Sequence, residues 1–363
     1  QCLHAFDNPG HAQLELFNWP QWARHAQKAT PWPTVFTTRK LFDTMYQIAD
    51  EFSLAAGKRY ISAAICTCAD HVENASGTPE EQAALLAEVL CRLSAIWVVF
   101  VLWPFYARGR IRPAEPVDWR DTEDSTPTAR SADASRAREQ HRQWTQQIMA
   151  RDNYWCPISG SFEYLVYDLP AMPPRALAAF IAGAPIIQRT VLTRGMCGSA
   201  LEHEIAAHVL RHFYGLDDAL LEKLDCPQNG LAMDTSVKYA FQRFMFCLRP
   251  TETPHRYKFE DLKPEIHFNV LQNVRGHVTP PPCSATLRLA PDLLRLHAAL
   301  GWVLRLSGAG AVFDTLYRPP PSRGSAAYLS PGGAAFWRSV VEYEGPAVCL
   351  EAELRDLITV LTR

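Results

Sequence analysis

Residues 227–248 have the sequence PQNGLAMDTSVKYAFQRFMFCL, and this stretch decides the fold that we expect. Asn229-Gly230 is a turn signal, because both residue types accept the backbone angles that tight turns require. The passage from Gly230 to Leu248 is then typical of a strand, a short helix and a second strand. The sequence therefore predicts a chain in which short strands alternate with helices at this point.

Further short strands are expected upstream of this passage. Phe162 to Tyr167 is a strand candidate, and Pro185-Ile186-Ile187 starts another. Ser199 to Tyr214 and Asp217 to Leu224 are expected to be helical, and Ala137 to Asp152 reads as a polar helix.

The two ends of the chain carry helical periodicity. Thr37 to Ser53 and Lys58 to His71 place apolar residues at helical spacing, and a third helix is predicted to begin at Thr78-Pro79. Thr78 can cap this helix and Pro79 suits its first turn. Asp292 to Leu306 is a strong helix prediction, and Pro346 to Thr362 is the last. Together with the short strands, these helices predict an α+β protein that is mostly helical.

The most apolar stretch runs from Leu93 to Tyr106, LSAIWVVFVLWPFY. At about fourteen residues it is shorter than the roughly twenty that a helix needs to cross a bilayer. Pro104 interrupts it. We interpret it as the buried end of a core helix and expect no membrane association.

Composition limits the classes of function. The 363 residues are 48% hydrophobic and 20% charged, with a formal net charge of -2, which is typical of a well-packed globular protein. Because nucleic-acid affinity depends on a basic surplus, nucleic acid is not an expected partner. The ten cysteines contain no CxxC pair and are expected to be scattered buried thiols. No signal peptide is visible, so we expect an intracellular protein, cytoplasmic or nuclear.

These observations predict four regions along the chain. Residues 1–110 form a helical N-terminal region, and residues 111–136, rich in Pro, Asp, Ser, Thr, Ala and Arg, form a linker or mobile loop. Residues 137–278 form a core with inserted helices. Residues 279–363 form a C-terminal helical region that packs on this core.

Several short motifs follow one another in a recognisable order. The main ones are RDNYWCPISG at 151–160, APII at 184–187, PQNGL at 227–231, FQRFMFCL at 241–248, PTETPHRY at 250–257 and LLRLHAALGWVLRLSG at 293–308. In this order they resemble the HNH-nuclease-like proteins that are abundant in basidiomycete fungi. The resemblance covers most of the chain, and it implies a small ββα-metal core in which a hairpin and a helix hold one divalent metal.

The resemblance also implies where the catalytic residues should lie, and two of them are replaced. Asn229 keeps the central asparagine, which fixes loop geometry, and Phe241 keeps a framework aromatic residue. Pro185 stands where the general-base histidine belongs, and Lys238 stands where the helix should carry a histidine. Since proline has no side-chain base and a protonated lysine is a poor ligand, the site is expected to be degenerate, with no metal bound.

Other residues could contribute to a site. Glu204, His208 and His212 lie at successive i+4 steps and could form a partial metal face, although we interpret them as a polar helix face. Cys156 could be a nucleophile, but a buried structural thiol is favoured. Tyr167 and the neighbouring aromatic residues could line an apolar ligand pocket, although they are more often core.

Three functions remain open. The first is a pseudo-nuclease that acts as a scaffold or binding protein, with a protein partner and no cofactor. The second is a repurposed, metal-independent enzyme that acts on an apolar small molecule, for example in a cyclisation of secondary metabolism. The third is a residual HNH endonuclease, which would need Mg²⁺ or Zn²⁺.

Overall fold

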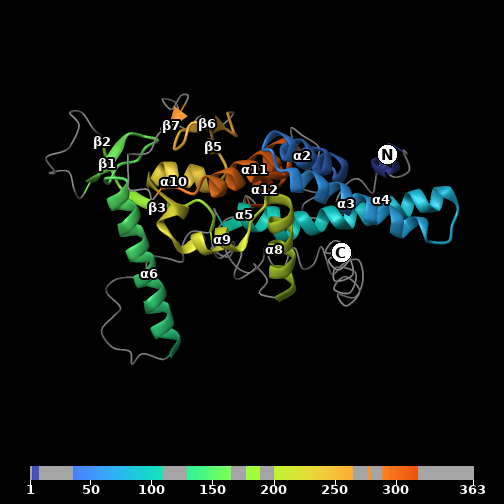
Figure 1. Cartoon of the computed structure of the whole chain (residues 1–363), viewed down its shortest axis with the longest axis horizontal. Coiled ribbons are helices and arrows are strands. Elements are labelled where there is room, and N and C mark those ends of the chain that lie inside the picture. The colour runs from blue at the N-terminus through green and yellow to red at the C-terminus, as the bar shows by residue number, and fades with distance from the viewer. Residues whose placement is uncertain are drawn as a thin grey trace, which may run out of the picture. The chain divides into compact units, whose positions relative to one another are not determined.

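A computed structural model describes residues 2–7, 36–108, 129–164, 177–188, 200–264, 277–278 and 288–317. These residues form a mostly helical α+β fold with small sheets, as the sequence predicts (Figure 1). The chain divides into two compact units, the first made of residues 1–106, 190–217 and 302–363, and the second of residues 107–189 and 218–301.

Unit 1 is helical in its described part. Its elements are η1 (Cys2–Asp7), α2 (Thr38–Glu51), α3 (Ala55–Glu73), α4 (Pro79–Trp97), the π-helix η3 (Val98–Leu102), the start of α5 (Trp103–Arg108), α8 (Ala200–Tyr214) and α12 (Ala309–Tyr317). Helix α3 packs against α2, α4 and α8. Their shared core is aromatic, because Trp97 stacks edge-on against Phe42 and lies beside Tyr60.

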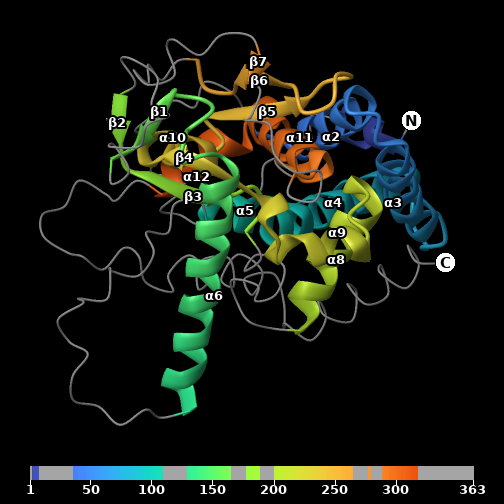
Figure 2. The ribbon, with the colours of Figure 1, turned by 60° about the vertical axis from the view of Figure 1, so that its left-hand side comes forward.

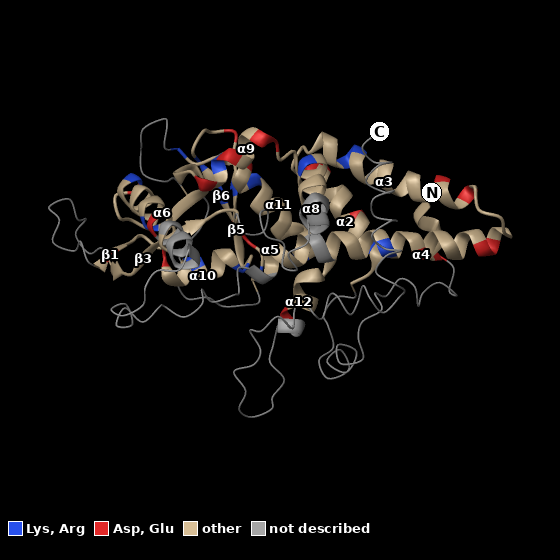
Figure 3. Ribbon diagram, turned by 90° about the horizontal axis from the view of Figure 1, so that it is seen from below, with Lys and Arg blue, Asp and Glu red and all other residues tan. Residues whose placement is uncertain are grey.

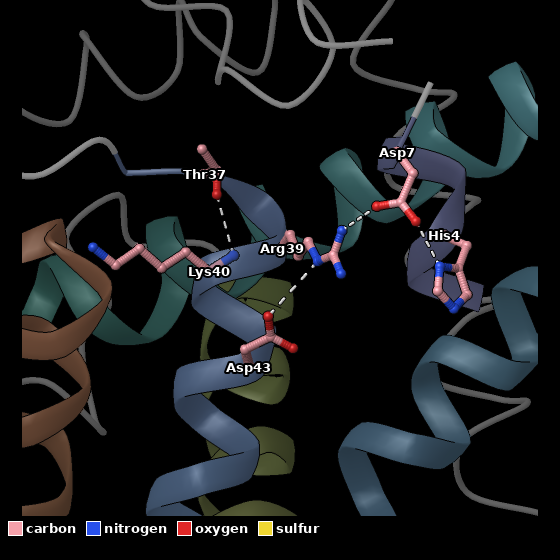
Figure 4. Close-up of polar contacts among 6 residues, drawn as sticks. All are labelled: His4, Asp7, Thr37, Arg39, Lys40 and Asp43. Atoms are coloured by element: carbon pink, nitrogen blue, oxygen red, sulfur yellow. Dashed lines mark hydrogen bonds and ion pairs between the residues drawn. The ribbon is translucent and has the colours of Figure 1, made fainter. Parts of the chain in front are cut away.

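The starts of two helices follow the predicted chemistry. Thr78 and Glu81 form a reciprocal capping box at the start of α4, with Pro79 in the first turn. At the start of α2 the Thr37 hydroxyl accepts a hydrogen bond from the Lys40 backbone N–H, 3.1 Å away (Figure 4). The predicted start of α4 is therefore confirmed, and the predicted α2 and α3 are also present.

Exposed ion pairs connect the short η1 segment to α2. The Asp7 carboxylate accepts from Arg39 of α2 and lies 2.6 Å from Nδ1 of His4 (Figure 4). Arg39 also lies 3.9 Å from a carboxylate oxygen of Asp43. All four side chains are exposed, so this network contributes little to stability.

The apolar stretch Leu93 to Tyr106 continues α4 through η3 into α5. Its described side chains are mostly buried, and the Tyr106 hydroxyl donates to the carboxylate of Asp314 in α12. The prediction of a buried helix end is confirmed. Among the helices that the structure describes, none has the length and the apolar character that crossing a membrane requires.

Unit 2 contains the strands. In chain order it has α6 (Ala129–Arg151), β1 (Ser161–Glu163), β2 (Leu177–Ala179), β3 (Ile181–Pro185), α9 (Asp218–Glu222), η5 (Lys223–Asp225), η6 (Pro227–Asn229), β4 (Gly230–Asp234), α10 (Thr235–Gln242), β5 (Phe246–Pro250), β6 (Tyr257–Asp261), β7 (His277–Val278) and most of α11 (Pro291–Ser307). Strands β1 and β2 pair in parallel, β3 and β4 pair antiparallel, and β5, β6 and β7 form an antiparallel sheet. The predicted strand, helix and strand between Gly230 and Leu248 are thus β4, α10 and β5.

Some predicted boundaries are wrong. Pro185 ends β3 and does not start a strand, and β1 covers Ser161–Glu163, so Tyr164 lies beyond its end. Helix α6 begins at Ala129, not at Ala137, within the range expected to be a linker. Ala and Arg are good helix formers, and their propensity offsets the lack of apolar periodicity. The predicted helix from Pro346 to Thr362 lies outside the described residues.

Candidate functional site

Strands β3 and β4 and helix α10 form one ββα arrangement. The strands are antiparallel, with Pro185 opposite Gly230 and Ile181 opposite Asp234. Helix α10 follows β4 directly, and the Asp234 carboxylate caps it by accepting from the Ser236 backbone N–H at 2.7 Å. Both α10 and α6 pack against the two strands (Figure 2).

Asn229 fixes the loop that enters β4. It is 1% exposed. Its side-chain oxygen accepts from the Ile187 backbone N–H at 2.9 Å, and its amide nitrogen donates to the carbonyls of Ile187 and Leu224 at 2.7 and 2.9 Å. Because both amide hydrogens are used within the fold, Asn229 serves as a structural clamp and has no donor left for a substrate.

The position of Pro185 in the ladder explains why a proline fits there. The Ile186 backbone N–H donates to the Asn229 carbonyl at 3.0 Å, so these residues form a hydrogen-bonded pair. Pairs alternate along an antiparallel ladder, and the neighbouring pair, Pro185 with Gly230, is therefore a non-hydrogen-bonded one. The nitrogen of Pro185 faces the outer edge of β3, where a missing N–H costs no ladder bond.

Lys238 of α10 binds the same edge of β3. Its Nζ donates to the Gly183 carbonyl at 2.8 Å, and the side chain is half-buried. Burial lowers the pKa of Lys238 below its usual value of 10.5. The ammonium thus joins the helix to the strand, two residues before Pro185.

Helix α6 packs against the strand pair β3 and β4. The Trp144 indole donates to the Cys226 carbonyl at 3.1 Å and stacks on the ring of His141, with ring centroids 5.5 Å apart. A Cβ on Gly183 would lie 3.0 Å from the Trp144 ring, and one on Gly230 would lie 2.6 Å from it. These two glycines therefore let the indole lie directly on the strands.

The edge of β4 is bound by a buried ion pair at the end of α6. Arg151 donates twice to Asp152, from Nε and Nη2, each at 2.7 Å, and both side chains are 1% exposed. Arg151 also donates to the carbonyls of Pro227 and Gly230, and Asp152 accepts from the Ala232 backbone N–H at 2.8 Å. Gly230 and Ala232 belong to non-hydrogen-bonded pairs of the ladder, so their bonded backbone groups point away from β3, and the ion pair takes the place of a neighbouring strand there.

The structure does not gather the other predicted site residues around Asn229 and Lys238. Cys156 is fully buried in the turn before β1, as expected, and its sulfur accepts from the Ser159 backbone N–H. His208 and His212 lie on α8 in unit 1, whereas Asn229 and Lys238 are in unit 2. Tyr167 lies outside the described residues.

Sequence reasoning missed three contributors to this region: Trp144, His141 and the pair Arg151–Asp152. The Arg151-Asp152 dipeptide lies in the motif at 151–160, but the resemblance implies no role for it. The sequence gives no signal for this role, because an adjacent Arg and Asp pair equally well at a solvent-exposed helix end. No sequence pattern indicated that an indole would lie on two glycines.

Within the described ranges, no three His, Cys, Asp or Glu side chains lie together in a way that could hold a metal ion. No family model, no curated protein and no solved structure matches this chain.

Proposed function

We propose that residues 137–278 contain a degenerate ββα-metal core of the HNH-nuclease type, and that the protein works as a scaffold or binding protein without hydrolysing DNA. The order β3, β4, α10 supports this proposal, since it is the order of a hairpin followed by a helix. Asn229 supports it as well, because its hydrogen bonds to Ile187 and Leu224 suit the loop-fixing role that the resemblance implies.

The bond from Lys238 to Gly183 is the observation that carries the proposal. A histidine at this position would face the strand with an imidazole that can bind metal, whereas Lys238 presents an ammonium that is already bonded to a carbonyl. Pro185 supplies no side-chain base at the end of the same strand. The two replacements remove the general base and the helical ligand together.

Charge gives weaker support. The chain has a formal net charge of -2, and basic and acidic residues are interspersed along the described elements (Figure 3). Tight binding of a phosphate backbone needs a run of positive charge, so a protein partner fits better than nucleic acid. The described cysteines are free, which suits a reducing setting such as the cytoplasm or nucleus.

A plasmid-nicking assay tests the proposal. The purified chain, incubated with supercoiled plasmid and Mg²⁺, Mn²⁺ or Zn²⁺ in turn, is expected to leave the plasmid intact. Cleavage by the unmodified chain that disappears in a folded Asn229→Ala variant would overturn the proposal in favour of a residual nuclease. Circular dichroism spectra of the variant establish that it is folded.

Restoring the replaced residues tests descent from a nuclease. The double variant Pro185→His, Lys238→His is expected to gain divalent-metal binding and metal-dependent nicking. Pro185→His with Lys223→His is the matched control, since Lys223 is an exposed lysine of the same unit. If the restored variant folds and binds no metal, the assignment of these positions to an HNH site is wrong.

A second candidate function is a metal-independent enzyme that acts on an apolar small molecule. One observation favours it: burial lowers the pKa of Lys238, and the nearby His141 and Trp144 rings supply a second base and an apolar surface. An amine with a lowered pKa can accept a proton or attack a carbonyl. Trinitrobenzenesulfonate labelling followed by peptide mass spectrometry is expected to modify Lys238 before the exposed lysines if this function holds. Slower labelling of Lys238 than of Lys223 would exclude it.

A further inference from the structure

Two histidines lie side by side on α8 in unit 1. His208 and His212 are one helical turn apart, and their ring centroids are separated by 4.4 Å. Residues at i and i+4 project from the same face of a helix, so the backbone itself holds the two rings together. This pair is separate from Asn229 and Lys238, which belong to unit 2.

His208 is buried without a partner for one of its ring nitrogens. The residue is 8% exposed, and its Nε2 has no hydrogen-bond partner. His208 is therefore a buried member of the polar face that the sequence predicts for this helix. A buried polar atom without a hydrogen bond lowers the free energy of unfolding. A ligand bound to Nε2 of His208 would offset this loss.

The ring of Tyr60 in α3 packs against both imidazole rings. Its ring centroid lies 5.6 Å from that of His208 and 6.2 Å from that of His212, on which it is stacked with a 16° angle between planes. His212 is exposed, whereas Tyr60 is 8% exposed. The two imidazoles are thus packed against an aromatic ring. An ion in solvent can reach the pair from the side of His212, which is exposed.

We propose that His208 and His212 form a two-histidine site for a divalent transition-metal ion that prefers imidazole, such as Zn²⁺ or Cu²⁺. Neutral imidazole is a common ligand of both ions, whereas Mg²⁺ prefers oxygen. Within the described residues no third His, Cys, Asp or Glu joins the pair, so water would fill the remaining coordination positions.

Metal titration of the whole chain tests the site. Isothermal titration calorimetry with ZnCl₂, and separately with CuCl₂, is expected to show one high-affinity ion per chain at pH 7, and no binding with MgCl₂. The His212→Ala variant is expected to lose at least about tenfold in affinity, because one imidazole lacks the advantage of two linked ligands. His71→Ala is the matched control, since His71 is an exposed histidine on α3 of the same unit, and it is expected to bind like the unmodified chain.

A spectroscopic readout separates the site from loose surface binding. Electron paramagnetic resonance of the Cu²⁺ complex is expected to show hyperfine coupling to two imidazole nitrogens, reduced to one in folded His212→Ala. His208→Phe keeps a buried ring and is expected to abolish the two-nitrogen signal. If His212→Ala retains the full affinity and signal, or if the unmodified chain binds neither ion, the proposal is wrong. These results do not depend on whether the chain cleaves DNA.

Discussion

The imidazole of His297 lies nearly parallel to the ring of Phe241, with centroids 4.0 Å apart and a 14° angle between the planes. Phe244 stacks on His297 at 4.6 Å, and Nε2 of His297 donates to the Phe241 carbonyl at 3.3 Å. A residue of α11 is thereby fixed to the end of α10, in unit 2. His297 is 3% exposed, so its ring is part of the core of unit 2.

The burial of His297 predicts a loss of stability in acid. Desolvation lowers the pKa of His297 to about 3, from an ordinary value of 6.5. The unfolded chain therefore binds more protons than the folded chain between these values. The stabilisation is fully present above pH 6.5 and is lost as the pH falls toward 3. At pH 5 the loss from this group is about 2 kcal/mol in the free energy of unfolding.

Urea unfolding at pH 7 and pH 5 measures this loss. From pH 7 to pH 5 the free energy of unfolding of the unmodified chain is expected to fall by about 2 kcal/mol more than that of His297→Phe, which cannot be protonated at this position. His71→Gln, an exposed histidine, is the control and is expected to behave like the unmodified chain. Equal losses in all three proteins would contradict the assignment of a neutral buried ring.

Much of the fold could be predicted because it depends on local patterns. Thr78, Pro79 and Glu81 start α4 through contacts within a few residues, and such contacts can be read from spacing alone. The role of His297 could not be predicted, because its partners Phe241 and Phe244 are more than fifty residues away in the sequence. A single sequence records no such pairing.

Removing the charge of Lys238 is expected to weaken the link between α10 and β3. Lys238→Met keeps an apolar side chain of similar length but leaves the Gly183 carbonyl without its donor. A net hydrogen bond contributes about 1 kcal/mol, so a loss of about 1 kcal/mol in the free energy of unfolding is expected. Lys223→Met removes an exposed charge from the same unit and is expected to leave the unfolding midpoint close to its original value. A stability for Lys238→Met equal to that of the control would mean that the bond contributes nothing.

Adding one methyl group to Gly230 is expected to displace α6. The new Cβ would meet Cδ1 of Ile148 and would lie 2.6 Å from the Trp144 ring, so the helix or the indole must move. Overpacking of this kind costs about 1–3 kcal/mol. Thermal unfolding of Gly230→Ala measures this cost, and near-ultraviolet circular dichroism reports the change in aromatic packing, to which Trp144 contributes. Gly77→Ala is the control, because its Cβ would be 3.3 Å from the flexible carboxylate end of Glu81. An unchanged spectrum and midpoint for Gly230→Ala would contradict the packing of α6 on the strands.

The candidate site could be predicted only in part, for a related reason. Asn229 and Lys238 were found because a resemblance assigned them positions. The sequence could not indicate that Nζ of Lys238 would bond to Gly183, since that contact depends on how α10 lies against β3. The sequence predicts that Pro185-Ile186-Ile187 starts a strand. The ladder instead places it last, at an edge position that needs no donor.

The ion pair Arg151–Asp152 is expected to be the most sensitive point of unit 2. In Asp152→Ala the guanidinium of Arg151, 1% exposed, would lose the carboxylate that accepts two of its hydrogen bonds. Removing one partner of a buried pair costs about 3–5 kcal/mol, measured as the change in the free energy of urea unfolding. The control is Glu139→Ala, which breaks the exposed pair with Arg142 on the same helix and is expected to leave the midpoint unchanged.

A double variant separates the pair's mutual attraction from its support of β4. Buried ion pairs can often be replaced by apolar residues without loss, because the cost of removing both charges from water disappears. Here the same side chains also bond to the Gly230 carbonyl and the Ala232 backbone N–H. Arg151→Met with Asp152→Leu would leave both backbone groups buried and unpaired, so it is expected to be as unstable as Asp152→Ala. Recovery of the original free energy of unfolding in the double variant would show that the hydrogen bonds from the ion pair to β4 contribute nothing to stability.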